Sequence, residues 1–207
     1  MGPYNEKNAA AAGNSCRSVK TGGSHMKWMI ASDVHGSAYY CKKLLEAFGQ
    51  EGADRLVLLG DILYHGPRND LPREYDPKQV TAMLNGCRDK LLCVRGNCDA
   101  EVDQMVLEFP VLAEYALLDL ENRLVYATHG HKYGPDCLPP LRTGDVLLCG
   151  HTHVPACRQI DGIWYLNPGS VSMPKEDSAP GYMTLEDGHF AWRDFEGHTL
   201  RTFTPGE

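Results

Sequence analysis

The chain has 207 residues, of which 43% are hydrophobic and 23% are charged, and a formal net charge of −7. This length and apolar content allow one domain with a sizeable core. The acidic balance, without a cluster of lysine and arginine, argues against a stable complex with nucleic acid. No apolar run approaches the roughly 20 residues of a membrane span.

Residues 1–25 have the composition of an expression tag. They are polar, rich in Gly, Ala, Ser and Asn, and end in Gly-Ser-His just before Met26. We expect this segment to be flexible and residues 26–207 to form a single domain. Without the tag the chain keeps 17 basic and 26 acidic residues, which gives a net charge of −9.

The first half of the domain alternates short apolar runs with amphipathic segments. The runs predict buried strands at Trp28–Ser32, Arg55–Gly60 and Leu91–Val94. The segments between them have apolar residues at helical spacing, which predicts helices at Tyr39–Gln50 and Pro77–Cys87. This strand–helix alternation implies parallel strands joined by right-handed crossovers.

The second half is predicted to be mostly antiparallel. Its hairpin signals are two Asp-Gly dipeptides and the pair Glu121-Asn122. The predicted strands are Val111–Leu120, Arg123–Thr128, Val146–Cys149, Ala156–Ile160, Ile163–Leu166, Tyr182–Leu185 and Phe190–Arg193. Together the halves suggest an α/β domain in which two sheets pack face to face with helices outside.

The cysteines predict no disulfide framework. Seven remain when Cys16 of the tag is set aside, and they are scattered, with no C-x-x-C pair. An odd, scattered set is typical of the reducing cytoplasm, which is the location we expect.

Acidic, amide and imidazole side chains recur where the apolar runs end. They lie in five short motifs: Asp33-Val34-His35, Gly60-Asp61, Gly96-Asn97-Cys98-Asp99, Thr128-His129-Gly130-His131 and Gly150-His151-Thr152-His153. Because parallel strands present their carboxyl ends at one edge of a sheet, we expect these motifs to converge there. Oxygen and nitrogen donors suit Mn²⁺, Fe²⁺ or Zn²⁺. They outnumber the ligands of one ion, so we predict two adjacent ions.

Each motif alone is common in loops, but their order resembles a known family. The series D-x-H, G-D, G-N-H-[D/E], H and G-H-x-H is the signature of the calcineurin-like metallophosphoesterases. Segments 61–69 and 95–99 are similar to those of the small bacterial YfcE-like phosphodiesterases within it. Asn167-Pro168-Gly169-Ser170 is a further familiar block. The resemblance implies a four-layer αββα sandwich of two mixed sheets flanked by helices.

The resemblance also implies a set of metal ligands. Asp33, His35 and His153 would hold the first ion, Asn97, His129 and His151 the second, and Asp61 would bridge them. All seven positions carry the residue type that the family uses. The expected metal is Mn²⁺, with Fe²⁺, Zn²⁺ or Ni²⁺ as alternatives.

Position 98 departs from the family signature. The family has a histidine there, which acts on the leaving group, whereas this chain has Cys98. A cysteine is a poor substitute for an imidazole in proton transfer, so Cys98 is either catalytic or merely a packed thiol. Asp99 is expected to support the loop or a ligand histidine. We name His131 and His65 as alternative proton donors and Arg68 as a candidate phosphate contact.

The function that the resemblance implies is hydrolysis of a small phosphodiester by a hydroxide that bridges two metal ions. Two alternatives stay open. A eukaryotic retromer subunit of the same fold is a protein-binding scaffold, and other relatives cleave phosphomonoesters. Relatives also often self-associate, which leads us to expect a homo-oligomer, either a dimer or a tetramer.

Overall fold

The computed structural model describes residues 26–120 and 123–206. The proposed tag at 1–25 and the turn Glu121-Asn122 lie outside the described residues. Within the described residues, no helix is long and apolar enough to cross a membrane. The seven cysteines of the described part are all free thiols, as the sequence predicted.

The first sheet has six strands in the order β11-β10-β9-β1-β2-β3. Strands β1, β2 and β3 pair in parallel, as predicted, and β9 adds to the other side of β1 in the antiparallel direction. The strands are β1 (Trp28–Ala31), β2 (Arg55–Leu58), β3 (Leu91–Cys93), β9 (Gly181–Glu186), β10 (His189–Asp194) and β11 (Thr199–Phe203). The hairpin predicted around Asp187-Gly188 is thus part of the same sheet as the start of the domain.

The second sheet has five strands in the order β4-β5-β6-β8-β7. They are β4 (Tyr115–Leu120), β5 (Arg123–Thr128), β6 (Val146–Leu148), β7 (Ala156–Ile160) and β8 (Ile163–Asn167). The β4–β5 and β7–β8 hairpins are antiparallel, as predicted. The three central strands, however, are parallel. The expectation of a mostly antiparallel second half was therefore incomplete, because the long segment between β5 and β6 permits a crossover.

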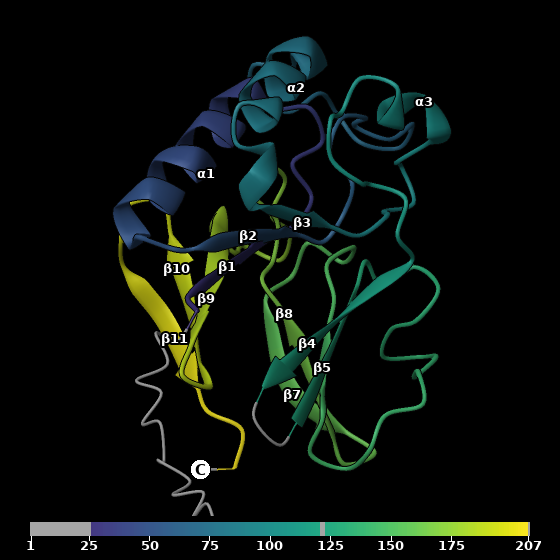
Figure 1. Ribbon diagram of the computed structural model, residues 1–207, viewed down its shortest axis with the longest axis vertical. Coiled ribbons are helices and arrows are strands. Elements are labelled where there is room, and N and C mark those ends of the chain that lie inside the picture. Colours follow the sequence, from purple (N-terminus) through teal and green to yellow (C-terminus); the bar gives the residue numbers. More distant parts are fainter. Residues whose placement is uncertain (1–25, 121–122, 207) are drawn as a thin grey trace, which may run out of the picture.

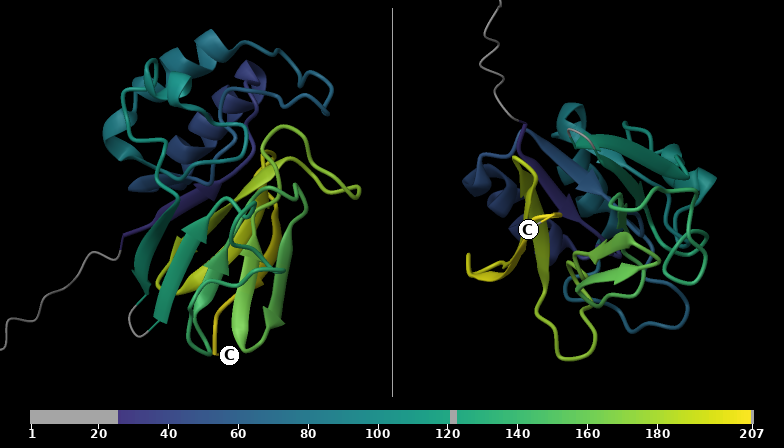
Figure 2. Two further views of the ribbon diagram at one scale, coloured as in Figure 1. Left: turned by 90° about the vertical axis from the view of Figure 1, so that its right-hand side faces the viewer. Right: turned by 90° about the horizontal axis from the view of Figure 1, so that it is seen from below.

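The helices lie together on one side of the molecule, next to the first sheet (Figure 1; left view of Figure 2). They are α1 (Ala38–Glu51), α2 (Pro77–Asn85), the 3₁₀ helix η1 (Arg88–Lys90) and α3 (Glu101–Gln104). Ser37 caps α1 by accepting a hydrogen bond from the Tyr40 amide, and Asp76 caps α2 by accepting one from the Gln79 amide. Both main helices confirm the sequence prediction. The one-turn helix α3 and strand β11 were not predicted.

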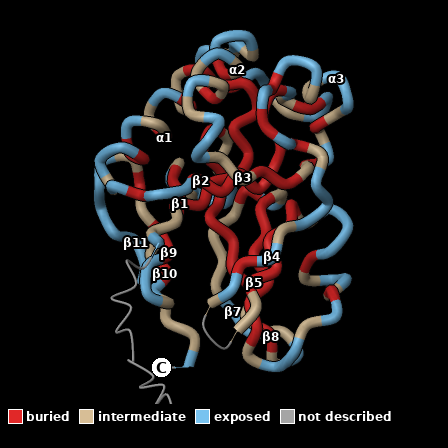
Figure 3. Tube along the Cα trace, in the orientation of Figure 1, coloured by how far each residue is buried: buried red, intermediate tan, exposed pale blue. Residues whose placement is uncertain are grey.

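Three apolar layers hold the sheets and helices together. Met29, Leu56 and Leu58 face α1 and α2, whereas their neighbours Ile30 and Val57 face the second sheet. This alternation follows from the two-residue period of a strand that is buried on both faces. Figure 3 shows the resulting burial of strands in the middle of the molecule. The third apolar layer lies on the outer face of the second sheet. It is covered by irregular chain that includes Leu138 and Leu141.

Parallel strands of both sheets end on the same side of the sandwich. β1 and β2 run directly into the Asp33 and Asp61 loops, and β5 runs into His129. Open α/β sheets bind ligands at this edge because the loops there leave a crevice. The fold thereby brings together motifs that are far apart in the sequence.

Substitution of Phe190 tests whether the apolar layer between the two sheets stabilises the fold. It is fully buried there, so Phe190→Ala should lower the free energy of unfolding by about 3–5 kcal/mol, through lost burial and the cavity left behind. Urea denaturation measures this. Leu200→Ala is the matched control: Leu200 is 54% exposed on β11, and its loss should change stability by about 0.5 kcal/mol or less. Equal losses in the two variants would contradict the layer assignment.

Candidate metal centre

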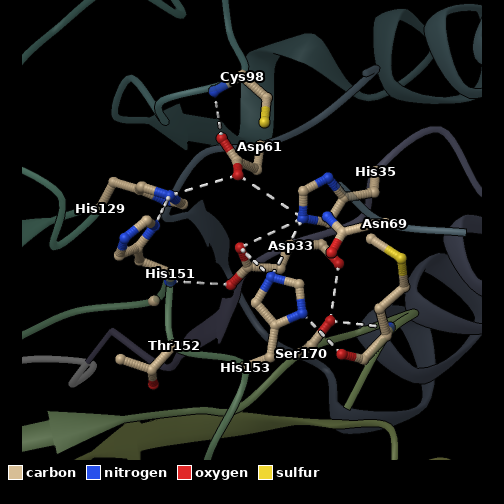
Figure 4. Close-up of polar contacts among 12 residues, drawn as sticks. Asp33, His35, Asp61, Asn69, Cys98, His129, His151, Thr152, His153 and Ser170 are labelled. Atoms are coloured by element: carbon tan, nitrogen blue, oxygen red, sulfur yellow. Dashed lines mark hydrogen bonds and ion pairs between the residues drawn. The ribbon is translucent and has the colours of Figure 1, made fainter. Parts of the chain in front are cut away.

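The seven predicted ligands converge at the carboxyl edge of the sheets (Figure 4 labels all of them except Asn97). Their donor atoms fall into two groups that share one carboxylate oxygen. In the first group, His35 Nε2 lies 3.3 Å from His153 Nε2 and 3.6 Å from Asp33 Oδ1. Asp33 Oδ1 is also 3.3 Å from His153 Nε2.

The second group surrounds the buried ring of His129. His129 Nε2 lies 3.0 Å from Asn97 Oδ1 and 3.2 Å from His151 Nδ1. It is also 3.4 Å from Asp61 Oδ2. Asp61 Oδ2 lies 3.6 Å from His35 Nε2 of the first group as well, so this single oxygen faces both groups.

Backbone carbonyls fix the tautomer of three of the histidines. The Nδ1 atoms of His35, His129 and His153 lie 2.8, 2.7 and 2.6 Å from the carbonyl oxygens of Tyr64, Leu59 and Met173. Because a carbonyl can only accept, each Nδ1 carries a proton, which leaves Nε2 as the nitrogen that coordinates when the ring is neutral. The sequence named Asp99 as a candidate for this support, but carbonyls provide it.

The donor set fits a divalent cation. The Nε2 atoms of His35 and His153 lie 3.3 Å apart, where two lone pairs would repel each other, and buried Asp33 Oδ1 has no hydrogen-bond partner. Ligand atoms about 2.1 Å from a metal lie about 3.0–3.4 Å from one another at octahedral or tetrahedral angles. The contacts of 3.0–3.6 Å match that spacing. A cation would turn these repulsive contacts into coordination.

The metal-free cluster attracts protons because its buried carboxylates favour positive charge nearby. Burial opposes the charge on His129, but the Asp61 and Asp33 carboxylates outweigh it and raise the pKa of His129 to about 9. Burial also works against the charge on Asp33, yet the neighbouring rings of His153, His35 and His129 hold its pKa well below the ordinary value. The carboxylates therefore stay ionised and demand positive charge nearby.

Left-handed backbone conformations aim the donors inward. Asp33, His35, Asp61, His151 and His153 all have φ between 49° and 67°. Such values are uncommon for residues with a Cβ and collect at functional sites, where the surrounding structure compensates for the strain. The motif glycine Gly96 allows the required close approach, because a Cβ there would lie 2.1 Å from Asp61 Oδ1.

Asp99 supports the loop backbone, which was one of its two predicted roles. Its Oδ2 accepts hydrogen bonds from the amides of Asp61 and Gly96 at 2.8 and 2.7 Å, and its Oδ1 accepts one from Ile62 at 2.9 Å. Asp61 is held from a second direction, because the Cys98 amide donates to its Oδ1 at 2.8 Å. Only Oδ2 of Asp61 is left for the donor cluster.

The Cys98 side chain lies at the edge of the cluster. Its Sγ is within 4.8 Å of donor atoms of both His35 and Asp61, and it accepts a hydrogen bond from the Asn97 amide group at 3.2 Å. Burial and the Asp61 charge raise the pKa of the Cys98 thiol to about 12 in the metal-free chain. The thiol is therefore protonated and uncharged at neutral pH.

The other sequence-predicted residues differ in their access to the site. The exposed ring of His131 lies 5.4 Å from the His129 ring, centre to centre. Arg68 is exposed and lines a cleft of about 590 Å³ that opens onto the donor cluster. His65 packs edge-on between Tyr64 and Tyr75 and is not among the described residues that line this cleft.

The cleft that opens onto the donor cluster, called the metal cleft from here on, contains residues that the sequence did not indicate. Lys175, which is far from Arg68 in the sequence, also lines it, together with Asn69 and Thr152. The Lys175 amide donates to the His153 carbonyl at 3.2 Å, which ties its loop to a ligand segment. No motif in the sequence pointed to Lys175. Asn167 and Ser170, which the sequence did point to, brace the site: they bond the carbonyls of Gly150 and Asp33 at 2.7 and 3.0 Å.

The metal affinity of the centre should depend on pH. At pH values between the ordinary 6.5 of histidine and about 9, His129 holds a proton in the metal-free protein, which an incoming ion must displace. The apparent affinity for Mn²⁺ should therefore rise with pH up to about 9, with release of a proton. Calorimetry in two buffers of different ionisation enthalpy measures both effects. His189→Gln, outside the cluster, should leave the pH profile unchanged, and a flat wild-type profile would refute the argument.

Comparisons with known proteins agree with this geometry. Residues 26–187 match the family described as the calcineurin-like phosphoesterase superfamily domain. The chain is 49% identical over 162 residues to Phosphodiesterase YfcE of Escherichia coli strain K12, an alignment that covers 78% of this chain and 88% of that protein.

Solved structures show the same fold. The structure of YfcE, a phosphoesterase from E. coli, superposes with a TM-score of 0.84 at 44% identity and covers 87% of this chain and 100% of that chain. Vacuolar Protein Sorting 29 from Cryptosporidium parvum has a TM-score of 0.55 at 17% identity, with 87% and 98% covered. The second likeness is one of fold alone.

Proposed function

The chain belongs to the calcineurin-like phosphoesterase superfamily, and we propose that it hydrolyses a small phosphodiester at a centre of two divalent metal ions. One observation carries the proposal: Asp61 Oδ2 lies 3.6 Å from His35 Nε2 and 3.4 Å from His129 Nε2, between the two groups of donor atoms. A shared carboxylate offsets the repulsion between two cations about 3.5–4 Å apart.

The proposed ligands are those that the sequence named. Asp33, His35 and His153 would hold one ion, Asn97, His129 and His151 would hold the other, and Asp61 would be shared between them. The mixture of carboxylate, amide and imidazole donors favours Mn²⁺, and Fe²⁺, Zn²⁺ or Ni²⁺ also suit it. When bound, such ions polarise the phosphoryl group and lower the pKa of a coordinated water enough for it to act as the nucleophile near neutral pH.

The protein side chains supply orientation and charge. The carbonyl-bound Nδ1 protons keep three imidazoles in the tautomer that coordinates, and the Cys98 amide holds Asp61 so that one oxygen is free. Arg68 and Lys175 supply positive charge to the metal cleft, where they are available to the phosphate oxygens. The candidates for protonating the leaving group are the neutral Cys98 thiol and the exposed His131 ring.

A diester is the preferred substrate class because the relative with 49% identity is named a phosphodiesterase. Self-association into a dimer or tetramer and a cytoplasmic location stay predictions from the sequence. The scaffold alternative has less support, because all seven donors are present and oriented.

Hydrolysis of two nitrophenyl esters by chelator-stripped protein tests the proposal. Added Mn²⁺ should restore cleavage of bis-p-nitrophenyl phosphate in preference to p-nitrophenyl phosphate. A preference for the monoester would favour a phosphomonoesterase instead. No cleavage with any divalent ion would overturn the enzyme assignment and favour a protein-binding scaffold.

Removal of the bridging carboxylate should abolish activity. Asp61→Ala should lower turnover by more than about a hundredfold, because loss of second-shell partners alone costs 10–100-fold. Metal content, measured by mass spectrometry of the purified variant, should fall in parallel. Asp119→Ala on exposed β4 is the matched control and should keep both. Full activity in Asp61→Ala would refute the shared-ligand centre.

Replacement of Cys98 should test its position relative to the leaving group. Cys98→His introduces an imidazole that is a better general acid near neutral pH, a role worth about 10²–10⁴-fold in favourable cases. Turnover of diesters with poor leaving groups, such as simple alkyl alcohols, should rise by at least about tenfold, with a smaller gain for p-nitrophenyl esters. Equal rates in the two proteins would mean that Cys98 is only a packed thiol.

A further inference from the structure

A second hollow, the apolar groove, adjoins the metal cleft at Cys98. It has a volume of about 370 Å³ and is lined by Leu63, Tyr64, Tyr75, Pro77, Cys98, Ala100, Val102 and Asp103. Cys98 lines both hollows. Figure 4 shows its side chain beside Asp61, at the edge of the donor cluster. Cys98 is the residue that the two hollows share, so its side chain lies between the donor cluster and the groove.

The chemistry of the groove differs from that of the metal cleft. Its walls are mainly aromatic and aliphatic, and Tyr64 and Val102 are 41% and 62% exposed. Among the described residues that line it, Asp103 alone is charged, and its carboxylate accepts a hydrogen bond from the Ala100 amide at 2.7 Å. An acidic, apolar surface disfavours a second phosphate and favours an uncharged group.

The aromatic wall is held by neighbouring side chains. The His65 ring packs edge-on against both tyrosines, with ring centres 4.7 Å from Tyr64 and 5.2 Å from Tyr75. Tyr75 also packs closely over Gly36. A preformed aromatic wall suits a stacked planar ring. The volume is sufficient, because an apolar cavity of about 150 Å³ already holds benzene.

We propose that the apolar groove binds an uncharged aromatic ring on one ester group of the substrate while the metal cleft holds the phosphate. The inference rests on the proposed function and deepens it: the substrate class becomes phosphodiesters of aromatic or heteroaromatic alcohols. Val102 and Tyr64 are then specificity-determining residues for the reaction. Cys98 stands between the phosphate and the ring.

Two phosphonates that cannot be hydrolysed test the groove separately from catalysis. Methylphosphonate and phenylphosphonate present the same anionic head to the centre and differ only in the organic group. Calorimetry with the Mn²⁺-loaded protein should show phenylphosphonate binding about tenfold more tightly, from burial of the ring. Val102→Gln makes the groove polar and Val102→Trp fills it, so both should reduce the preference to about twofold or less.

Met105→Gln is the matched control. Met105 is 83% exposed just beyond α3 and does not line the groove, so this variant should keep the wild-type preference. Unchanged methylphosphonate affinity in all three variants would show that the metal centre is intact. The oligomeric state of the same proteins is measured by light scattering.

The outcomes separate the two proposals. If neither phosphonate binds, the metal-centre proposal fails together with this one. Equal binding of both phosphonates leaves the proposed function standing and overturns the groove assignment. A preference that survives both Val102 variants, or that Met105→Gln also removes, overturns it as well. Conversion of an oligomer to a monomer by Val102→Gln would mean that a second copy of the chain covers the groove, which also overturns it.

Discussion

The structure depends on one electrostatic constraint: electron pairs of several buried acceptors are directed at the same two points. Three ring nitrogens cannot turn away, because backbone carbonyls hold the opposite nitrogen of each ring. Two carboxylates complete the cluster and stay ionised despite their burial. Only cations relieve this arrangement, and in their absence protons do so in part, as the raised pKa of His129 shows.

The fold maintains this unfavourable arrangement through packed strands and hydrogen-bonded turns. The donors sit in tight turns that follow parallel strands, and the strands are fixed by two apolar layers. Buried Asp99 ties together the amides of two of these turns, and the glycine at position 96 lets their backbones touch. The left-handed conformations of the ligand residues are therefore supported from several sides, as strained functional sites require.

Much of this could be predicted from the sequence, for physical reasons. Apolar runs, helix caps and Asp-Gly turns are local signals, so most strands and both main helices were predicted correctly. The partner strands of the last hairpin were not predictable, because sheet membership depends on contacts between distant segments. The motifs located the donor residues, but not the carbonyls that orient the rings, since every residue has a carbonyl. Lys175 carries no motif and enters the cleft only through the path of its loop.

The hydrogen bond that the Cys98 backbone amide donates to Asp61 Oδ1 has an evolutionary consequence. The carboxylate that we propose as the bridging ligand is held by the main chain of residue 98 and not by its side chain. Any residue other than proline provides the same N–H group. Selection can thus exchange the side chain at this position, and with it the chemistry at the edge of the donor cluster, while Asp61 keeps its orientation. The fold in this way allows the side chain of residue 98 to vary while the position of the Asp61 carboxylate stays constant.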